Sequence, residues 1–179
     1  LRERSLTGRD AAFATELVAG TCRWQGSYDK IIAAAAGRPL GDFQPALLDL
    51  LRLGAHQILS MRTPVPAAIA ATVDLAALTV GERVTGVTNA VLRRVANRSL
   101  DEWFDRLSDG LDDLDRLALR TAHPRWIVDG YADLLPQSEL EEALAANNVS
   151  PEISLVVRPG LAEVSDLMGA GAQPSRYSP

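Results

Sequence analysis

The spacing of apolar residues over the first hundred positions constrains the fold most. Between residues 9 and 61, apolar residues and glycines recur every three or four positions, which places them on one face of a helix. The stripes run through Phe13, Leu17, Gly20 and Trp24, and through Leu47, Leu51, Gly54, Ile58 and Met61. A shorter helix between them ends at Gly37, and two more stripes follow Pro64 and Gly81. The pattern therefore predicts five helices before residue 99.

Helical signals continue as far as residue 148. Ser99 with Glu102, and Ser138 with Glu141, have the spacing of a capping box and predict helix starts. Between these two pairs, residues 111–122 and the amphipathic stretch introduced by His123-Pro124 also have the pattern of helices. We therefore expect a helical domain over residues 1–148.

The pattern changes after Pro151. Residues 152–158 include the β-branched run Ile-Ser-Leu-Val-Val between two prolines, which predicts a strand, and residues 161–168 predict a short helix. A single strand has no neighbour to pair with, so the rest of its sheet must lie further along a longer chain. We predict a mainly α protein, in which a helical bundle over 1–148 is followed by an incomplete α/β segment over 149–179.

Composition and chain ends limit the class of protein. The chain of 179 residues has one cysteine, no signal-peptide pattern and no apolar run of the about 18 residues that span a membrane. We expect a soluble, cytoplasmic protein with no membrane segment, no disulfide framework and no metal site. The chain begins with Leu1 rather than Met, and residues 169–179 are mostly loop formers, so we expect both ends to be truncated.

Charge is divided unevenly along the chain. Residues 1–98 hold 12 basic and 8 acidic residues, whereas residues 99–179 hold 6 basic and 15 acidic residues. The basic front half permits a nucleic-acid surface, although a pI near 5.0 is low for such a protein. Candidate phosphate contacts are Arg93, Arg94 and Arg98, on the helix after Gly81, and Arg9 and Arg23, which flank the first stripe. Glu16 lies between the last two, so a solvated ion-pair face is an open alternative there.

Three features could be mistaken for catalytic or ligand sites. Cys22 lies within a predicted helix, and we expect it to pack in the core rather than to act as a nucleophile. Gly169-Ala-Gly-Ala follows a predicted helix instead of a strand, so a turn is favoured over a nucleotide-binding loop. His56 and His123 have no metal-ligand spacing and are predicted to be structural. We expect no catalytic, cofactor-binding or metal-binding residue in this chain.

An ordered set of motifs resembles the Sun/Fmu (RsmB) family of rRNA methyltransferases. Its NusB-like part is matched by Arg9-Asp10-x-x-Phe13, by the run from Leu53 to Leu59 and by the run from Thr88 to Arg94. His123-Pro124-x-Trp126, Ala145-Ala146-Asn147-Asn148 and Leu155-Val156-Val157-Arg158 resemble the join to the methyltransferase part. The last run usually reads Leu-Arg-Val-Asn in the family, so this sequence departs from the pattern there.

The resemblance implies a function for the parent protein. The family methylates C5 of a cytosine in small-subunit rRNA with S-adenosylmethionine, using cysteines of Pro-Cys and Thr-Cys motifs in a downstream domain that this chain lacks. It also implies a helix before Leu1. We therefore expect a non-catalytic region that binds rRNA and supports the downstream methyltransferase domain. The alternative is a free-standing NusB-like module of transcription antitermination, and a third possibility is a scaffold whose arginines are merely solvated.

Overall fold

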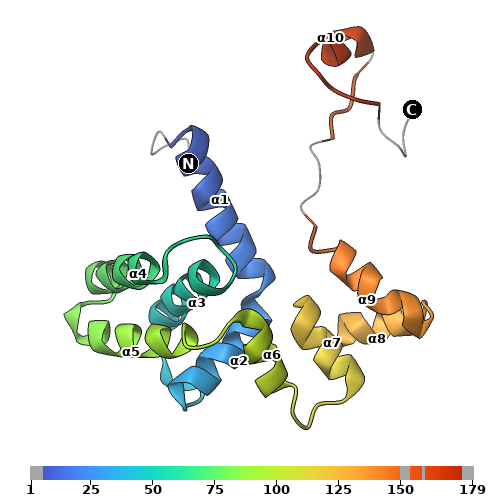
Figure 1. Cartoon of the computed structure of the whole chain (residues 1–179). Coiled ribbons are helices and arrows are strands. Elements are labelled where there is room, and N and C mark those ends of the chain that lie inside the picture. The colour runs from blue at the N-terminus through green and yellow to red at the C-terminus, as the bar shows by residue number, and fades with distance from the viewer. Residues whose placement is uncertain (1–5, 150–153, 159, 175–179) are drawn as a thin grey trace. The chain divides into compact units, whose positions relative to one another are not determined.

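The computed structural model describes residues 6–149, 154–158 and 160–174 (Figure 1). Within this part of the chain the structure is helical, and no β-strand forms. The helices before residue 99 are α1 (Gly8–Arg23), α2 (Gln25–Ala36), α3 (Pro45–Leu59), α4 (Val65–Thr79) and α5 (Thr85–Val95), with the single turns η2 (Leu40–Asp42) and η3 (Glu82–Val84). They are followed by α6 (Leu100–Leu107), α7 (Asp113–Thr121), α8 (Arg125–Ala132), α9 (Gln137–Ala146) and α10 (Val164–Gly169). The predictions of a mainly helical fold and of five helices before residue 99 are confirmed.

The chain divides into two compact units, Leu1–Asn148 and Val149–Pro179. Helices α1 to α9 belong to the first unit and α10 to the second. None of the helices in the described part of the chain is both long and apolar enough to cross a membrane.

The main core of the first unit lies where α2, α3, α5 and α6 meet (Figure 1). Leu51 of α3 and Leu92 of α5 are fully buried there, and α6 contributes Trp103 and Phe104. The indole Nε1 of Trp103 donates to the carbonyl of Val95 at 2.8 Å, which leaves no unpaired polar atom on this large buried ring. The apolar stripes of the sequence are therefore the core faces of these helices.

Gly54 allows α3 to approach its neighbours closely. A Cβ atom at this position would lie 2.8 Å from both methyl groups of Leu92 and 3.1 Å from the Thr72 hydroxyl oxygen. Thr72 belongs to α4 and Leu92 to α5, and both are buried. The glycine within the second stripe thus has a packing role, because a larger residue would push three helices apart.

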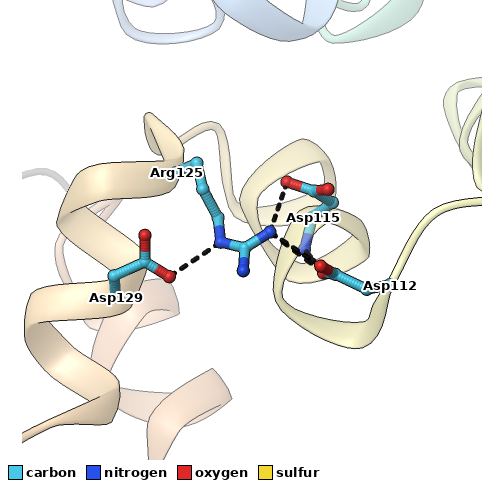
Figure 2. Close-up of polar contacts among 4 residues, drawn as sticks. All are labelled: Asp112, Asp115, Arg125 and Asp129. Carbon is cyan, nitrogen blue, oxygen red and sulfur yellow. Dashed lines mark hydrogen bonds and ion pairs between the residues drawn. The ribbon is translucent and has the colours of Figure 1, made fainter.

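A smaller core joins α7, α8 and α9. Its buried members are Ala118, Val128, Leu140 and Leu144. On the surface beside it, Arg125 of α8 contacts three carboxylates (Figure 2). Its guanidinium lies 2.7 Å from Asp129, 2.8 Å from Asp115 and 2.9 Å from Asp112, so α8 is fastened to the start of α7.

One of the two predicted capping boxes forms. The Ser99 hydroxyl accepts from the amide of Glu102 at 3.3 Å, and the Glu102 carboxylate accepts from the amide of Ser99 at 2.7 Å. The prediction for Ser138 is wrong, because α9 already begins at Gln137, directly after Pro136. The fixed φ of Pro136 and its extended backbone set the start of the helix two residues earlier than the serine pattern indicated.

The predicted strand is not present where the structure describes it. Residues 154–158 adopt no regular structure, and the other residues predicted for the strand, Glu152 and Ile153, lie outside the described part. A strand needs a partner for its backbone hydrogen bonds, and no neighbouring strand forms in the described residues. The short helix after it does form, as α10, but begins at Val164, three residues later than predicted.

Candidate nucleic-acid interface

Arg93 and Arg94 lie on the exposed side of α5. The opposite side of this helix buries Val91, Leu92 and Val95 in the core. The Arg93 Nε donates to the side-chain oxygen of Asn89 at 3.0 Å, and the Arg94 guanidinium donates to the carbonyl of Ala35 at 3.3 Å. Both guanidinium groups are held close to the protein surface and still have several donors free for phosphate oxygens.

Arg98 does not lie on the same helix, so the prediction that it follows Arg94 by one helical turn is wrong. Helix α5 ends at Val95, and Ser99 already has the extended backbone of the cap of α6. In the turn between the helices, the Arg98 guanidinium lies 5.2 Å from the ring centroid of Trp103. Contact with a tryptophan ring favours one arrangement of an otherwise flexible cation.

Arg9 and Arg23 lie at opposite ends of α1. Fourteen positions separate them, which corresponds to about 21 Å along a helix. Arg9 is exposed, whereas Arg23 is half-buried in the last turn. Glu16, between them, approaches the ring of His56 at 4.0 Å instead of pairing with either arginine in the described structure. The structure therefore shows no ion-pair face of the kind that the sequence left open.

The five candidate arginines differ from several others in their charge environment. Among the described residues, none of the five lies within 4.0 Å of a carboxylate oxygen, whereas Arg52, Arg116, Arg120 and Arg125 all do. Residues 100–148, which form α6 to α9, hold 4 arginines and 12 acidic residues. The net charge of α6 to α9 is therefore negative, which disfavours a phosphate group there relative to the front half of the chain.

His56 of α3 bonds to α2 and packs against α1. Its Nδ1 lies 2.8 Å from the Tyr28 hydroxyl, which also contacts the Ser60 hydroxyl at 2.7 Å. The Nε2 atom is buried without a hydrogen-bond partner and faces Glu16 and Gly20, and a Cβ atom at position 20 would overlap the imidazole ring. Burial lowers the pKa of His56, so the ring is neutral at pH 7. This group is structural, as predicted.

The motif residues of the expected join meet at the end of α7. His123 Nδ1 lies 2.7 Å from the carbonyl of Thr121, and its Nε2 lies 3.3 Å from the side-chain amide nitrogen of Asn147. That amide nitrogen also donates to the Tyr131 hydroxyl at 3.0 Å, and the amide of Asn148 donates to the Thr121 carbonyl at 2.6 Å. His123 is thus structural as well. These bonds fix the end of α9, where the first unit ends.

Cys22 is exposed, so the prediction that it packs in the core is wrong. Its neighbours Gly20 and Thr21 are the buried residues of α1, and the next position turns about 100° away from that face. Among the described residues, no base forms a hydrogen bond with its thiol. Exposure alone does not activate a thiol, so the chemistry of a nucleophile is not supported there.

The turn predicted at residues 169–172 forms at Ala170 and Gly171, directly after α10, which ends at Gly169. Gly171 has a φ of 95°, and no helix begins between this turn and residue 174. A nucleotide-binding loop needs a following helix whose first amides face the ligand, so these residues do not fit one. In the part of the chain that the structure describes, no three His, Cys, Asp or Glu side chains are grouped to hold a metal ion.

Sequence reasoning found the arginines but missed the residues that hold them. Asn89 lies four positions before Arg93 on the same helix, a spacing that could have indicated the contact, whereas the Ala35 carbonyl that binds Arg94 carries no sequence signal. The capping-box spacing at Ser99 could have shown that α5 ends before this residue, because the residue that caps one helix has an extended backbone and cannot belong to the preceding helix.

Known proteins similar to this chain agree with the motifs. Residues 1–97 match the NusB family. The chain is 41% identical over 184 residues to a putative methyltransferase of Mycobacterium tuberculosis, covering 100% of this chain and 40% of that protein. It is 33% identical over 149 residues to the ribosomal RNA small subunit methyltransferase B of Pseudomonas putida, covering 83% of this chain and 32% of that protein.

A probable ribosomal RNA small subunit methyltransferase B of Bacillus subtilis is 26% identical over 169 residues. That match covers 94% of this chain and 37% of that protein, so the chain spans less than half the length of each of these relatives. The matched family and the names of these relatives confirm the resemblance to the Sun/Fmu (RsmB) group. The chain belongs to the NusB family.

Proposed function

We propose that this chain is the RNA-binding and scaffolding N-terminal region of an S-adenosylmethionine-dependent rRNA (cytosine-C5) methyltransferase, and that it does not itself transfer the methyl group. The observation that carries the proposal is the extent of similarity. The NusB family match ends at residue 97, whereas similarity to methyltransferases continues through α6 to α9 and covers the whole chain in one relative. An rRNA substrate would place the protein in the cytoplasm.

RNA contact is proposed for Arg9, Arg23, Arg93, Arg94 and Arg98. Two observations support it: these side chains are free of carboxylate partners in the described structure, and they lie on the basic half of the chain. The acidic helices α6 to α9 would confine the RNA to the front helices.

The scaffolding role is proposed for the end of the first unit and for residues 149–179. The hydrogen bonds of His123 and Asn147 hold the point where the chain leaves α9. Beyond it, Leu155, Val156 and Leu161 are 62%, 87% and 80% exposed. Such apolar exposure is typical of a surface that a further part of the protein covers. We infer that 149–179 begins an α/β methyltransferase subdomain and that residues 152–158 become a strand beside its other strands.

The alternative is a free-standing NusB-like module of transcription antitermination. The observation that favours it is that the NusB match alone accounts for α1 to α5. The similarity of residues beyond 97 to methyltransferases argues for the first proposal. A gene whose reading frame continues past Pro179 into a glycine-rich S-adenosylmethionine loop and a Pro-Cys motif would decide between them, and a stop codon there would contradict the methyltransferase.

Binding of a small-subunit rRNA fragment tests the RNA role. Changing Arg93, Arg94 and Arg98 together to Glu should weaken binding by more than about tenfold at moderate salt, because three phosphate contacts are replaced by repulsion. A matched control reverses three exposed arginines outside the front half, Arg106, Arg116 and Arg158. Equal affinities of the two variants would contradict direct contact by Arg93, Arg94 and Arg98.

Cofactor binding tests the other half of the proposal. Calorimetric titration of the chain with S-adenosylmethionine should give no stoichiometric heat, because the described residues offer no fitting loop. Stoichiometric binding would overturn the assignment of this chain as non-catalytic.

A further inference from the structure

We propose that a hollow between the α3–α4 connection and the α5–α6 turn binds one unstacked base of single-stranded RNA. The inference rests on the proposed RNA-binding function and specifies where a nucleotide would be recognised. The hollow has a volume of about 410 Å³, and its lining includes Ile58, Leu59, Val65, Asn97, Arg98 and Leu100. This volume is within the range of about 300–1,000 Å³ found for small-molecule sites.

The walls of the hollow suit the faces of a base. Ile58 and Leu59 come from the last turn of α3, Val65 begins α4 and Leu100 begins α6. Val65 is 37% exposed, so apolar surface remains accessible to a ligand. A nucleobase is flat and weakly polar on its faces, and single-stranded RNA can turn such a base out of its stack.

The rim of the hollow offers a matched pair of polar groups. The side chains of Asn97 and Arg98 have no hydrogen-bond partner among the described residues, and both are exposed. An asparagine amide presents one donor and one acceptor face, which can pair with two neighbouring atoms on a base edge. Arg98 lies at the next position and can bind the phosphate attached to that nucleotide.

Charge inside the hollow selects a base over a phosphate. Glu102 also lines it, and the carboxylate is held there by its capping bond to the Ser99 amide. That hydrogen bond lowers the pKa of Glu102, so the carboxylate is ionised near neutral pH. A negative group in the hollow repels phosphate but tolerates a neutral base, which leaves the phosphate outside with Arg98. Arg93 and Arg94 lie in the last turn of α5, before this turn, and do not themselves line the hollow.

The test uses the full 179-residue chain and a 12-nucleotide single-stranded RNA from small-subunit rRNA. It also uses a set of RNAs of the same sequence, each of which lacks the base at one position. Fluorescence anisotropy gives the Kd of each. We expect one abasic position to weaken binding about tenfold, as loss of a bidentate base contact does. Asn97→Ala, and Val65→Phe, which fills the hollow, should each reduce that penalty to less than about twofold while the salt dependence of binding stays unchanged.

Leu78→Phe is the matched control, because Leu78 is 83% exposed on the same helix α4 and does not line the hollow. It should keep the full abasic penalty, and circular dichroism checks the fold of every variant. If the unmodified chain binds all abasic RNAs equally and with the usual salt dependence, the base site is refuted while RNA binding stands. If the chain binds no RNA, both the site and the proposed RNA role fail.

Discussion

Replacing Gly54 by alanine tests the close packing of α3, α4 and α5. The new Cβ would lie 2.8 Å from the methyl groups of Leu92 and 3.1 Å from the Thr72 oxygen, both well inside ordinary contact. Leu92 is 0% exposed and Thr72 is 3% exposed, so neither can move aside without displacing its neighbours. Overpacking of this kind costs about 1–3 kcal/mol, and the higher helix propensity of alanine returns about 1 kcal/mol. The expected net loss is therefore about 0–2 kcal/mol.

Gly86→Ala is the matched control for this substitution. Gly86 also lies in a helix, α5, but no atom would lie within 4 Å of its added Cβ. This variant should be more stable than the original chain by about 0.5–1 kcal/mol, because only the propensity term remains.

Urea denaturation followed by far-UV circular dichroism measures both changes. The Gly54→Ala midpoint should fall with little change in slope, and a second substitution that removes volume, Leu92→Val, should lose less stability in the Gly54→Ala background than alone. If Gly54→Ala were as stable as Gly86→Ala, the contact between these three helices would not be as close as described.

Two further stability predictions concern polar groups. Because burial lowers the folded-state pKa of His56 below its ordinary value near 6.5, the unfolded chain binds more protons, and stability should fall as the pH drops below about 6.5 towards that lower pKa. In the His56→Gln variant, the urea midpoint should change less between pH 7 and pH 5.5 than it does in the original chain. If the midpoint changes with pH equally in both, His56 is not the group responsible. Ser99→Ala removes the capping box of α6 and should cost about 1 kcal/mol in the same assay. Ser138→Ala, at a serine that caps no helix, should change stability by much less, and equal losses would contradict the assigned helix starts.

The main helices could be predicted because their signals are local. Spacing of apolar residues and the positions of Pro64 and Gly81 are enough to separate α3, α4 and α5. The packing role of Gly20 and Gly54 could not be predicted from the spacing. Each glycine makes room for a side chain of another helix, which only the fold reveals.

The errors arose where neighbours in space decide the outcome. Cys22 follows the buried residues of α1 by one position, which turns its side chain about 100° around the helix axis. The general preference of cysteine for burial does not predict on which side of a helix a given cysteine lies. The run at 154–158 has the residue types of a strand, but pairing depends on a second strand. The contact of Tyr28 with His56 joins residues 28 positions apart, so no local pattern announces it.

Of the proposed site, the sequence supplied the arginines but not their arrangement. Arg93 and Arg94 are on α5 as predicted, whereas Arg98 belongs to the turn that Ser99 imposes. The hollow beside that turn is formed by the ends of four helices that are up to forty-four positions apart, Ile58 to Glu102, and only the fold brings them together.

The most direct test of an RNA-binding role for this NusB-family chain is the salt dependence of its affinity for a small-subunit rRNA fragment. The logarithm of the binding constant should fall linearly with the logarithm of salt concentration, and removing the charges of Arg93, Arg94 and Arg98 should lessen that slope by about 2 for a single-stranded target. The control variant at Arg106, Arg116 and Arg158 should keep the original slope. Binding that is independent of salt, or a slope that the two variants change equally, would contradict phosphate contact by these arginines.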